Sequence, residues 1–257
     1  MLLSENLLSF RNVSKSYYGN TVLSNINIEV KKGEIHALIG ENGAGKSTLM
    51  NILFGMPVIH TTGGYEGEIL IDGKTTNIRS PHEAMEAGIG MVHQEFMLIP
   101  QYTIAENIKL NREITSPNAV SAILGKRLET IDMAKMNDHA RKALDKLDMN
   151  IEAYTMVAGL PVGHMQFIEI AREIDKTGIK ILVFDEPTAV LTESEAQNLL
   201  SAIRRLADMG IGIMFISHRL DEIVSVADRV TVLRDGEHVA TKDIGDTNAA
   251  EIASLMI

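Results

Sequence analysis

The most informative stretch of the sequence is Gly40-Glu41-Asn42-Gly43-Ala44-Gly45-Lys46-Ser47. It matches the pattern Gly-x-x-x-x-Gly-Lys-Ser/Thr in full, and Thr48 follows it. A short apolar run, Ile35–Ile39, precedes this stretch, and a helical pattern, Lys46–Phe54, follows it. A buried strand, a glycine-rich loop and a helix in this order form a phosphate-binding loop. The sequence therefore predicts such a loop over residues 40–48.

The glycines of this loop let the backbone turn its N–H groups toward phosphate oxygens, and the following helix adds partial positive charge. We expect Lys46 to reach the β- and γ-phosphates of a nucleotide and Ser47 to hold Mg²⁺. The expected nucleotide-binding residues are Gly40, Asn42, Gly43, Ala44, Gly45, Lys46, Ser47 and Thr48. The alternative is a glycine-rich turn that binds nothing, and the flanking strand and helix argue against it.

Two carboxylates follow another apolar strand. Asp185 and Glu186 come directly after Ile181–Phe184. A parallel strand should carry both acids to the carboxyl edge of its sheet, beside the phosphate loop. We expect Asp185 to help hold Mg²⁺ through the water shell of Ser47, and Glu186 to orient or deprotonate an attacking water. An ordinary solvated turn is the alternative, and the phosphate loop upstream disfavours it.

Short apolar strands recur along the chain, and helical patterns separate the later ones. They are Ile35–Ile39, Ile89–Val92, Ile181–Phe184, Ile211–Ile216 and Val230–Leu233. This alternation predicts an α/β fold with a P-loop NTPase core, a mainly parallel sheet with flanking helices. Ile26, Ile28 and Val30 alternate with polar residues, and Glu68–Ile71 runs into the turn residues Asp72-Gly73. These patterns predict an antiparallel β subdomain.

The middle of the chain has helical patterns. Thr103-x-x-Glu106 predicts a capped helix through Leu110, and Thr192-x-x-Glu195 predicts another further on. One face of a longer helix is expected from Ile131, Ala134, Leu144 and Leu147. We expect one domain over 1–257, with a β-rich lobe at about 7–32 and 65–80, a nucleotide core at about 33–60, 85–94 and 178–245, and a helical insertion at about 95–177.

Composition excludes several function classes. The 257 residues, 45% of them hydrophobic, suffice for one large α/β domain, and the net charge of −10 argues against binding nucleic acid. The chain has no cysteine, which excludes disulfides and thiolate metal sites, and its eight histidines form no cluster typical of zinc. No apolar run approaches the ~20 residues of a membrane span, and Met1–Phe10 lacks the pattern of a signal peptide. We therefore expect a soluble, cytoplasmic chain that reaches a membrane only through a partner.

Taken together, these residues resemble the nucleotide-binding domain of ABC transporters over nearly the whole chain. Besides the phosphate loop and the two acids, Tyr17, Gln94 and His218 carry the resemblance. It implies that Tyr17 stacks on adenine, with Tyr18 as the neighbouring alternative. It also implies that Gln94 senses Mg²⁺ and the γ-phosphate and links them to the membrane partner. His218 would contact the γ-phosphate and the attacking water.

The resemblance implies ATP and Mg²⁺ as cofactors and ATP hydrolysis as the activity. The implied catalytic residues are Lys46, Gln94, Glu186 and His218, and the implied metal ligands are Ser47, Gln94 and Asp185. A lone glutamine or histidine is weak evidence, but Gln94 and His218 each follow a predicted strand. We interpret His36 and His93 as structural residues.

The family signature, Leu-Ser-Gly-Gly-Gln, is altered in this chain. The matching stretch is Leu160-Pro161-Val162-Gly163-His164, before a helix with the apolar residues Phe167, Ile168, Ala171 and Ile174. Gly163 keeps a close backbone approach, whereas Pro161 lacks the hydroxyl and the N–H of serine. In the family two domains pack head to tail, and each ATP lies between one phosphate loop and the partner's signature. The resemblance thus implies that Leu160, Pro161 and Gly163 face the partner's ATP in a weak or silent site, whereas the site of Lys46 can hydrolyse ATP.

A second departure lies in the loop after the acids. The family often ends this loop in aspartate, whereas Ala189–Thr192 ends in threonine, which suits the cap of the next helix.

Several stretches resemble the importers of simple sugars and of nucleosides. They are Gly33–Leu38, Gly90–Glu95 and Glu186–Thr192. In those systems one polypeptide usually carries two such domains, and this chain stops in an apolar helix at Ser254–Ile257, so we expect the first of two domains. The implied partners are a second ABC ATPase domain on the same full-length chain, transmembrane permease subunits and, indirectly, an extracellular binding protein. The expected location is peripheral, on the inner face of the cell membrane. Phe96–Pro100 is the candidate contact with the membrane subunit, and core packing is the alternative for Met97 and Leu98.

Other functions stay open. A soluble ABC ATPase acting on ribosomes or DNA usually brings basic arms or coiled coils, and neither is present. A regulatory domain that binds ATP without hydrolysing it suits the altered signature but not Glu186 and His218. An exporter is disfavoured because no membrane segment is fused to the chain.

Overall fold

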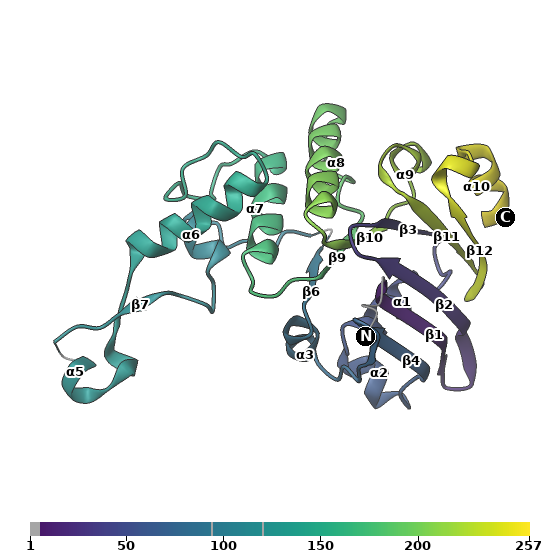
Figure 1. Ribbon diagram of the computed structural model, residues 1–257, viewed down its shortest axis with the longest axis horizontal. Helices are drawn as coiled ribbons and strands as arrows, with labels where there is room; N and C mark the ends of the chain where they lie inside the picture. The colour runs from purple at the N-terminus through teal and green to yellow at the C-terminus, as the bar shows by residue number, and fades with distance from the viewer. Residues whose placement is uncertain (1–5, 94, 120) are drawn as a thin grey trace. The chain divides into compact units, whose positions relative to one another are not determined.

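The computed structural model of the protein describes residues 6–93, 95–119 and 121–257. These residues form two compact units (Figure 1). Unit one comprises the described residues of Met1–Gln94, Gly178–Ala189 and Ala196–Ile257, and unit two those of Glu95–Thr177 and Val190–Glu195. The phosphate loop, Asp185, Glu186 and His218 belong to unit one, whereas Pro161 belongs to unit two.

A ten-stranded sheet, counted over the described residues, forms the centre of unit one. The strands are β1 (Asn6–Tyr17), β2 (Asn20–Lys31), β3 (Ile35–Ile39), β4 (Glu66–Ile71), β5 (Lys74–Thr75), β6 (Ile89–Val92), β9 (Ile181–Asp185), β10 (Gly212–Ile216), β11 (Arg229–Arg234) and β12 (Glu237–Asp243). Their order across the sheet is β5-β4-β1-β2-β12-β11-β3-β10-β9-β6. Neighbours among β6, β9, β10, β3 and β11 pair in parallel, whereas β1, β2, β4 and β5 pair antiparallel. The expected α/β fold with an antiparallel β part is confirmed.

Burial explains the two kinds of strand. All residues of β3 and β10 are buried, as in parallel strands that are covered on both faces. In β2, by contrast, Ile26, Ile28 and Val30 are buried while the residues between them are exposed. This alternation is that of a strand with one face on the core. β4 and β5 pair around Asp72 and Gly73, which confirms the predicted hairpin.

The helices of unit one follow the strands of the sheet. They are α1 (Lys46–Leu53), α2 (Pro57–Thr61), α3 (Pro81–Glu86), α9 (Leu220–Val226) and α10 (Ala249–Met256), with a short 3-10 turn at Ile244–Asp246. α10 packs against α9 and β11 (Figure 1). α8 (Glu193–Asp208) begins in unit two and continues in unit one. Its cap is confirmed, because the N–H and O–H of Thr192 donate to the Glu195 carboxylate. Its apolar face is buried at Ala196, Leu199, Leu200, Ile203 and Leu206.

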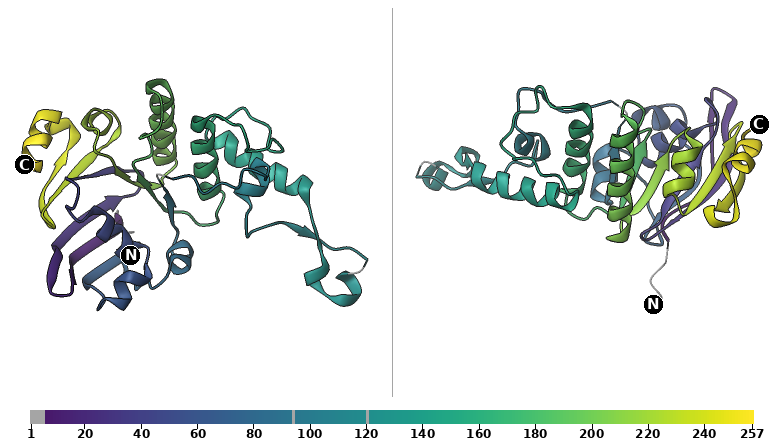
Figure 2. Two further views of the ribbon diagram at one scale, coloured as in Figure 1. Left: turned by 180° about the vertical axis from the view of Figure 1, so that it is seen from behind. Right: turned by 90° about the horizontal axis from the view of Figure 1, so that it is seen from above.

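Unit two is mainly helical. Its elements are α4 (Ile104–Ile108), β7 (Thr115–Ser116), α5 (Ser121–Leu124), a 3-10 turn at Lys126–Leu128, β8 (Thr130–Ile131), α6 (Met133–Lys146) and α7 (Val162–Ile174). α4, α6 and α7 pack against one another, and the two-stranded ribbon of β7 and β8 carries α5 away from them (Figure 2). Thr103 and Glu106 form the predicted capping box of α4, although this helix ends at Ile108 rather than Leu110.

The predicted face of the longer helix is partly wrong. Leu144 and Leu147 are buried, but Ala134 is exposed, and Ile131 lies in β8 with 53% of its surface exposed. The reason is that Asp132 caps α6 by accepting the Lys135 N–H, so the helix starts after Ile131. The buried face consists of Met136, Ala140, Ala143 and Leu144.

A membrane span needs a long apolar helix. Over residues 6–93, 95–119 and 121–257, no helix has the required length and apolar character.

Candidate nucleotide-binding site

The phosphate loop joins β3 to α1, and the sheet packs closely against its back. A side-chain carbon on Gly40 would lie 2.3 Å from the Leu233 carbonyl oxygen, so only glycine fits there. Gly45 has a left-handed φ of 100° just before α1. A side-chain carbon on it would lie 2.4 Å from Leu23 Cδ2. Both glycines are therefore required by the fold at the positions that the motif demands.

The outer side of the loop is open. Ala44 is buried and its N–H donates to the Glu41 carbonyl at 3.1 Å, which closes the turn. Four loop residues are exposed, and Thr48 is half-buried. The exposed residues are Glu41, Asn42, Gly43 and Ser47. A ligand can thus reach the loop from this side.

Lys46 folds its side chain back over its own loop. Its Nζ donates to the carbonyl oxygens of Gly40 at 2.6 Å and Glu41 at 3.1 Å. Burial lowers the pKa of Lys46, and the charges of Glu186 and Asp185 act in the opposite direction. The ammonium group therefore lies over the loop and inside the electric field of both acids.

The pairing of the strands places Asp185 at the same edge of the sheet as the phosphate loop. β10 pairs in parallel with β3 on one side and β9 on the other. Ile216 of β10 lies opposite Leu38 of β3 and opposite Asp185 of β9. Asp185 therefore ends its strand at the same edge where the phosphate loop begins. This is the arrangement that the two sequence patterns predicted for the carboxyl edge of the sheet.

The charge on Asp185 should destabilise the fold in the absence of a bound cation. Burial raises the pKa of Asp185 and the charge of Glu186 adds to it, while His93 and Lys46 lower it. An acid whose folded-state pKa exceeds the unfolded-state value makes stability rise as the pH falls through the folded-state pKa. We expect Asp185→Asn to raise the Tm of the nucleotide-free protein at neutral pH by on the order of 2 °C.

Differential scanning calorimetry measures this effect. Asp185→Asn should also remove the Mg²⁺-dependent part of ATP binding, as measured by titration calorimetry with and without Mg²⁺. Glu66→Gln removes an exposed carboxylate of β4 and should change neither quantity. A lower Tm for Asp185→Asn than for the unmodified protein would contradict the expected sign.

Glu186 and His218 meet beyond the ends of β9 and β10. Glu186 has a left-handed φ of 47°, and its N–H donates to the Ile216 carbonyl at 2.9 Å. This turn brings Glu186 Oε1 to 3.0 Å from His218 Nδ1. The two side chains are 26% and 63% exposed, so water reaches the pair. Left-handed backbone at a non-glycine residue is a feature that clusters at functional sites.

Buried residues without a predicted role hold this region in place. Thr188 Oγ1 donates to Glu222 Oε2 at 2.7 Å, and both residues are buried. The other Glu222 oxygen lies 2.6 Å from the Arg219 guanidinium. These contacts tie the loop after β9 to α9. Because Thr188 and Glu222 are 34 residues apart, no local pattern in the sequence signals their pairing.

Tyr17 lies in the hairpin that packs against the phosphate loop. It ends β1 and pairs with Asn20 of β2, and the next residues of β2 reach Leu23, which touches Gly45. Tyr17 is half-buried, whereas Tyr18 is 94% exposed. Which of the two tyrosines stacks on adenine stays a prediction.

Lys15 fixes the ring of Tyr17. Its Nζ lies 4.5 Å from the ring centroid, within the range of a cation–π contact. The same group donates to the carbonyl oxygens of Thr62 at 2.9 Å and Gly64 at 2.7 Å. Burial lowers the pKa of Lys15. Lys15 therefore connects the loop after α2 to the Tyr17 ring.

Comparison with known proteins identifies the family. A model described as ABC transporter matches residues 23–189. The chain belongs to the ABC transporter family. It is 39% identical over 255 residues to the xylose import ATP-binding protein XylG of Thermoanaerobacter pseudethanolicus, covering 99% of this chain and 48% of that protein. It is 42% identical over 251 residues to the ribose import ATP-binding protein RbsA of Hahella chejuensis, covering 98% and 47%. The chain spans about half the length of the curated relatives it matches.

A solved structure supports the same assignment. The ADP conformation of an ATP-binding cassette of an ABC transporter is similar to this chain, with a TM-score of 0.76 and 25% identity. The similarity covers 97% of this chain and 98% of the other one. The ABC ATPase fold predicted from the sequence is therefore confirmed over nearly the whole chain.

The stretch that the resemblance matches to the ABC signature, Leu160–His164, lies in unit two at the start of α7. Pro161 occupies the cap position and makes no side-chain capping bond, Leu160 is half-buried and Gly163 is buried. A side-chain carbon on Gly163 would lie 2.6 Å from Glu195 Oε1. Hydrogen bonds from the N–H and O–H of Thr192, and one from the Gly163 N–H, lower the pKa of Glu195. A carboxylate of the same chain thus lies at the first turn of this helix.

Two further polar residues were singled out in the sequence, Gln94 and His36. Gln94 lies outside the described residues, so its role stays a prediction. His36 is fully buried, with Nδ1 3.0 Å from Glu34 Oε1 and Nε2 2.8 Å from Thr231 Oγ1. These two contacts confirm that His36 is a structural residue.

Proposed function

We propose that the chain is the ATP-hydrolysing domain, and the N-terminal half of a tandem, in a bacterial ABC importer of simple sugars or nucleosides. The names of the relatives, xylose import and ribose import ATP-binding proteins, support the class of cargo. One observation carries the proposed hydrolysis: Glu186 Oε1 lies 3.0 Å from His218 Nδ1, at the sheet edge where the phosphate loop begins. Both units belong, in this proposal, to one ABC ATP-binding domain over residues 1–257.

The residues at this sheet edge fit a magnesium nucleotide. The loop offers backbone N–H groups and an ammonium group for phosphates. Ser47 and Asp185 would hold Mg²⁺ together with Gln94. Among the described residues, no group of three or more His, Cys, Asp or Glu could hold a metal ion. A small protein ligand set suits Mg²⁺, because this ion keeps several waters and takes further ligands from phosphates. Tyr17 would stack on the adenine ring.

The Glu186–His218 pair supplies the proton chemistry. Glu186 takes a proton from water while the water oxygen bonds to the γ-phosphorus and the bond from that phosphorus to the β–γ bridging oxygen breaks. The products are ADP and phosphate, with the proton on Glu186. His218, 3.0 Å from Glu186 Oε1, orients the carboxylate and contacts the γ-phosphate. Lys46 neutralises charge on the phosphate oxygens.

Two such domains would pack head to tail and form unequal ATP sites. Leu160, Pro161 and Gly163 of this chain would face the ATP held by the partner domain. Pro161 offers that ATP neither a hydroxyl nor an N–H. Glu195 already lies at the start of α7, where it adds negative charge near an incoming phosphate. The site of Lys46 is therefore the working one, provided that the partner's signature is intact.

Restoring the signature serine should strengthen the opposite site. Pro161→Ser returns one hydroxyl and one N–H, and a hydrogen bond to a charged group contributes about 1.5–3 kcal/mol. We expect the affinity of the opposite site for ATP to rise about tenfold or more in the full-length protein. Equilibrium binding of labelled ATP, resolved into two sites, measures the change.

The control for this substitution is Pro117→Ser, which alters an exposed proline of unit two and should leave both sites unchanged. If Pro161→Ser leaves the weaker site as weak as before, Pro161 does not cause the asymmetry.

Phe96–Pro100 would contact a permease subunit at the inner face of the cell membrane. Met97 is 56% exposed, which disfavours core packing for this residue, and Leu98 is half-buried. Gln94 would link this surface to the γ-phosphate. The chain is then a peripheral protein, and the extracellular binding protein acts on it only through the permease.

Reconstitution of the full-length protein with its permease in proteoliposomes tests the proposed function. We expect Mg²⁺-dependent ATP hydrolysis that increases when binding protein loaded with sugar or nucleoside is added. ATP binding without turnover in the assembled complex would instead favour a regulatory domain. Hydrolysis that responds to ribosomes or DNA, but not to the permease, would favour a soluble ATPase.

A further inference from the structure

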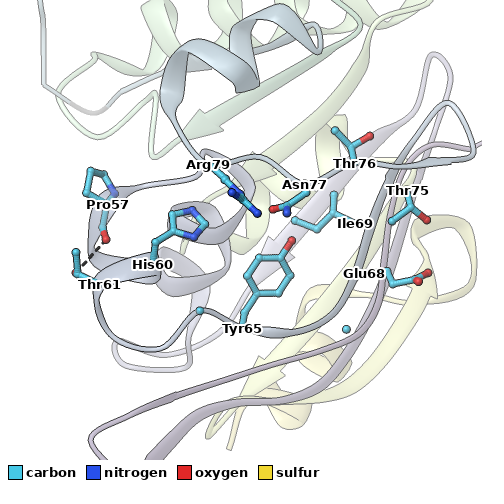
Figure 3. Close-up of a pocket in the computed structure, with 12 residues that line it drawn as sticks. Pro57, His60, Thr61, Tyr65, Glu68, Ile69, Thr75, Thr76, Asn77 and Arg79 are labelled. Carbon is cyan, nitrogen blue, oxygen red and sulfur yellow. Dashed lines mark hydrogen bonds between the residues drawn. The ribbon is translucent and has the colours of Figure 1, made fainter.

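Unit one contains a hollow that shares no residue with the proposed nucleotide site. Its volume is about 770 Å³, and α2, β4, β5 and the segment after β5 form its walls (Figure 3). This volume falls within the range of about 300–1,000 Å³ that is typical of small-molecule sites. The side chains that matter for the argument are His60, Tyr65, Glu68, Thr75, Asn77 and Arg79. We call this cavity the α2–β4 hollow.

One end of the α2–β4 hollow gathers groups that can bind an anion. Figure 3 shows His60, Asn77 and Arg79 directed toward this end. In the part of the chain that the structure describes, the Arg79 guanidinium has no ion-pair partner, and only its backbone N–H is bonded, to Glu83. The His60 Nε2 is buried and has no hydrogen-bond partner among the described residues. Asn77 and Arg79 are exposed, so an anion in the hollow can reach both side chains, whereas the covered His60 Nε2 becomes available only if the imidazole ring turns.

The other end suits hydroxyl groups. Glu68 and Thr75 lie there, on the far side of Tyr65 from Arg79 (Figure 3). A carboxylate and a threonine hydroxyl both accept hydrogen bonds from ligand hydroxyls. Burial raises the pKa of Tyr65, so its phenol stays protonated and able to donate at neutral pH. The Tyr65 ring between the two ends offers an apolar face to the carbon skeleton of a ligand.

The wall of the hollow is held in place before any ligand arrives. Lys15 binds the carbonyl oxygens of Thr62 and Gly64 in the loop after α2. Thr61 Oγ1 donates to the Pro57 carbonyl at 3.0 Å and ties the last turn of α2 to its first. A preformed wall lowers the ordering entropy that ligand binding would otherwise cost.

We propose that the α2–β4 hollow binds a sugar phosphate, a small molecule with a phosphate at one end and several hydroxyls at the other. The phosphate would take two hydrogen bonds from the planar guanidinium of Arg79, with His60 and Asn77 as further partners. The hydroxyls would bind Glu68 and Thr75. Phosphorylation of an imported simple sugar yields this class of compound, so the site would report on the product of uptake. That last link rests on the proposed function, whereas the binding chemistry does not.

Titration calorimetry with ribose 5-phosphate, in the presence of saturating MgATP, tests the site directly. We expect one molecule to bind per chain with a Kd of about 10 μM to 1 mM. Ribose alone and inorganic phosphate alone should each bind at least about tenfold more weakly, because each offers only half of the contacts. MgATP keeps the phosphate loop filled and thereby separates the two sites.

Variants locate the ligand. Arg79→Gln should weaken ribose 5-phosphate binding at least about tenfold, and Tyr65→Phe and His60→Gln should weaken it less. Arg127→Gln, which removes an exposed arginine of unit two, should bind the ligand as the unmodified protein does. MgATP affinity should be unchanged in all four variants, which shows that they are folded.

Three results would overturn the proposal. The first is the absence of binding at about 10 mM ribose 5-phosphate in protein that binds MgATP. The second is full affinity in Arg79→Gln, and the third is loss of the site when MgATP is added, which would place the sugar phosphate at the phosphate loop. A fourth result would also overturn it: inorganic phosphate that binds as tightly as ribose 5-phosphate would show that the hydroxyl end plays no role. None of these results depends on whether the chain hydrolyses ATP.

Discussion

Glu186→Gln should lower the ATPase rate of the assembled transporter by about 100-fold or more, because general-base catalysis contributes roughly 10²- to 10⁴-fold. The amide cannot accept the proton of the attacking water. It has the same shape as the carboxylate and can keep the contact with His218, which is 3.0 Å long in the native protein. ATP should therefore still bind. Phosphate release measures turnover, and equilibrium dialysis with labelled ATP measures binding.

The matched control is Glu66→Gln, which makes the same chemical change at an exposed position of β4 and should leave the rate unaltered. His218→Ala offers a second comparison, because it removes the partner of Glu186 and should also reduce turnover while ATP binding persists. An undiminished ATPase rate in Glu186→Gln would mean that this site is not the working one of the pair.

Lys46→Ala should remove most of the ATP affinity of this site. The ammonium group makes charge-assisted hydrogen bonds to phosphate, and their loss costs about 2–3 kcal/mol, roughly a 30- to 150-fold weaker Kd. In the native fold the same group binds the carbonyl oxygens of Gly40 and Glu41. Titration calorimetry with MgATP measures the affinity. The rise in Tm that MgATP causes should shrink in parallel.

Lys74→Ala provides the control, since Lys74 is an exposed lysine in β5 and lies outside the phosphate loop. It should bind MgATP with native affinity. Native affinity in Lys46→Ala would contradict the assignment of the phosphate site. A large fall in the Tm of the nucleotide-free protein would instead show that Lys46 acts mainly by holding its own loop together.

Local patterns predicted much of the fold correctly because they report on local physics. Strand β3 runs over the predicted residues Ile35–Ile39, and α1 begins at the predicted Lys46. Hydrophobic alternation and capping boxes reflect contacts between residues that are close in the sequence. They can therefore be recognised from the order of the residues alone. The helix face predicted from Ile131 and Ala134 failed for a related reason. The cap at Asp132 and the pairing of β7 with β8 decide where α6 begins.

The candidate site shows the same difference between what local patterns predict and what tertiary contacts set. Asp185, Glu186 and His218 could be singled out because each follows an apolar strand, and parallel strands end at a common edge. The roles of these residues, like that of Gln94 and the domain boundaries, stay predictions. The contact between Glu186 and His218 and the bond between Thr188 and Glu222 could not be foreseen, since 32 and 34 residues separate the partners.

The order of the residues alone was enough to predict the phosphate loop and the mainly parallel α/β core, and it supplied the candidates for the site residues. Each of these features depends on a short stretch of sequence that requires particular residue types at fixed spacing. How the side chains meet depends on the folded chain. The register of β3, β9 and β10 sets the level of Asp185, and α2, β4, β5 and the segment after β5 together line the hollow with His60 and Arg79. The physical reason is that such contacts join residues far apart in the chain, and sheet register and side-chain packing fix them only once the whole unit has folded.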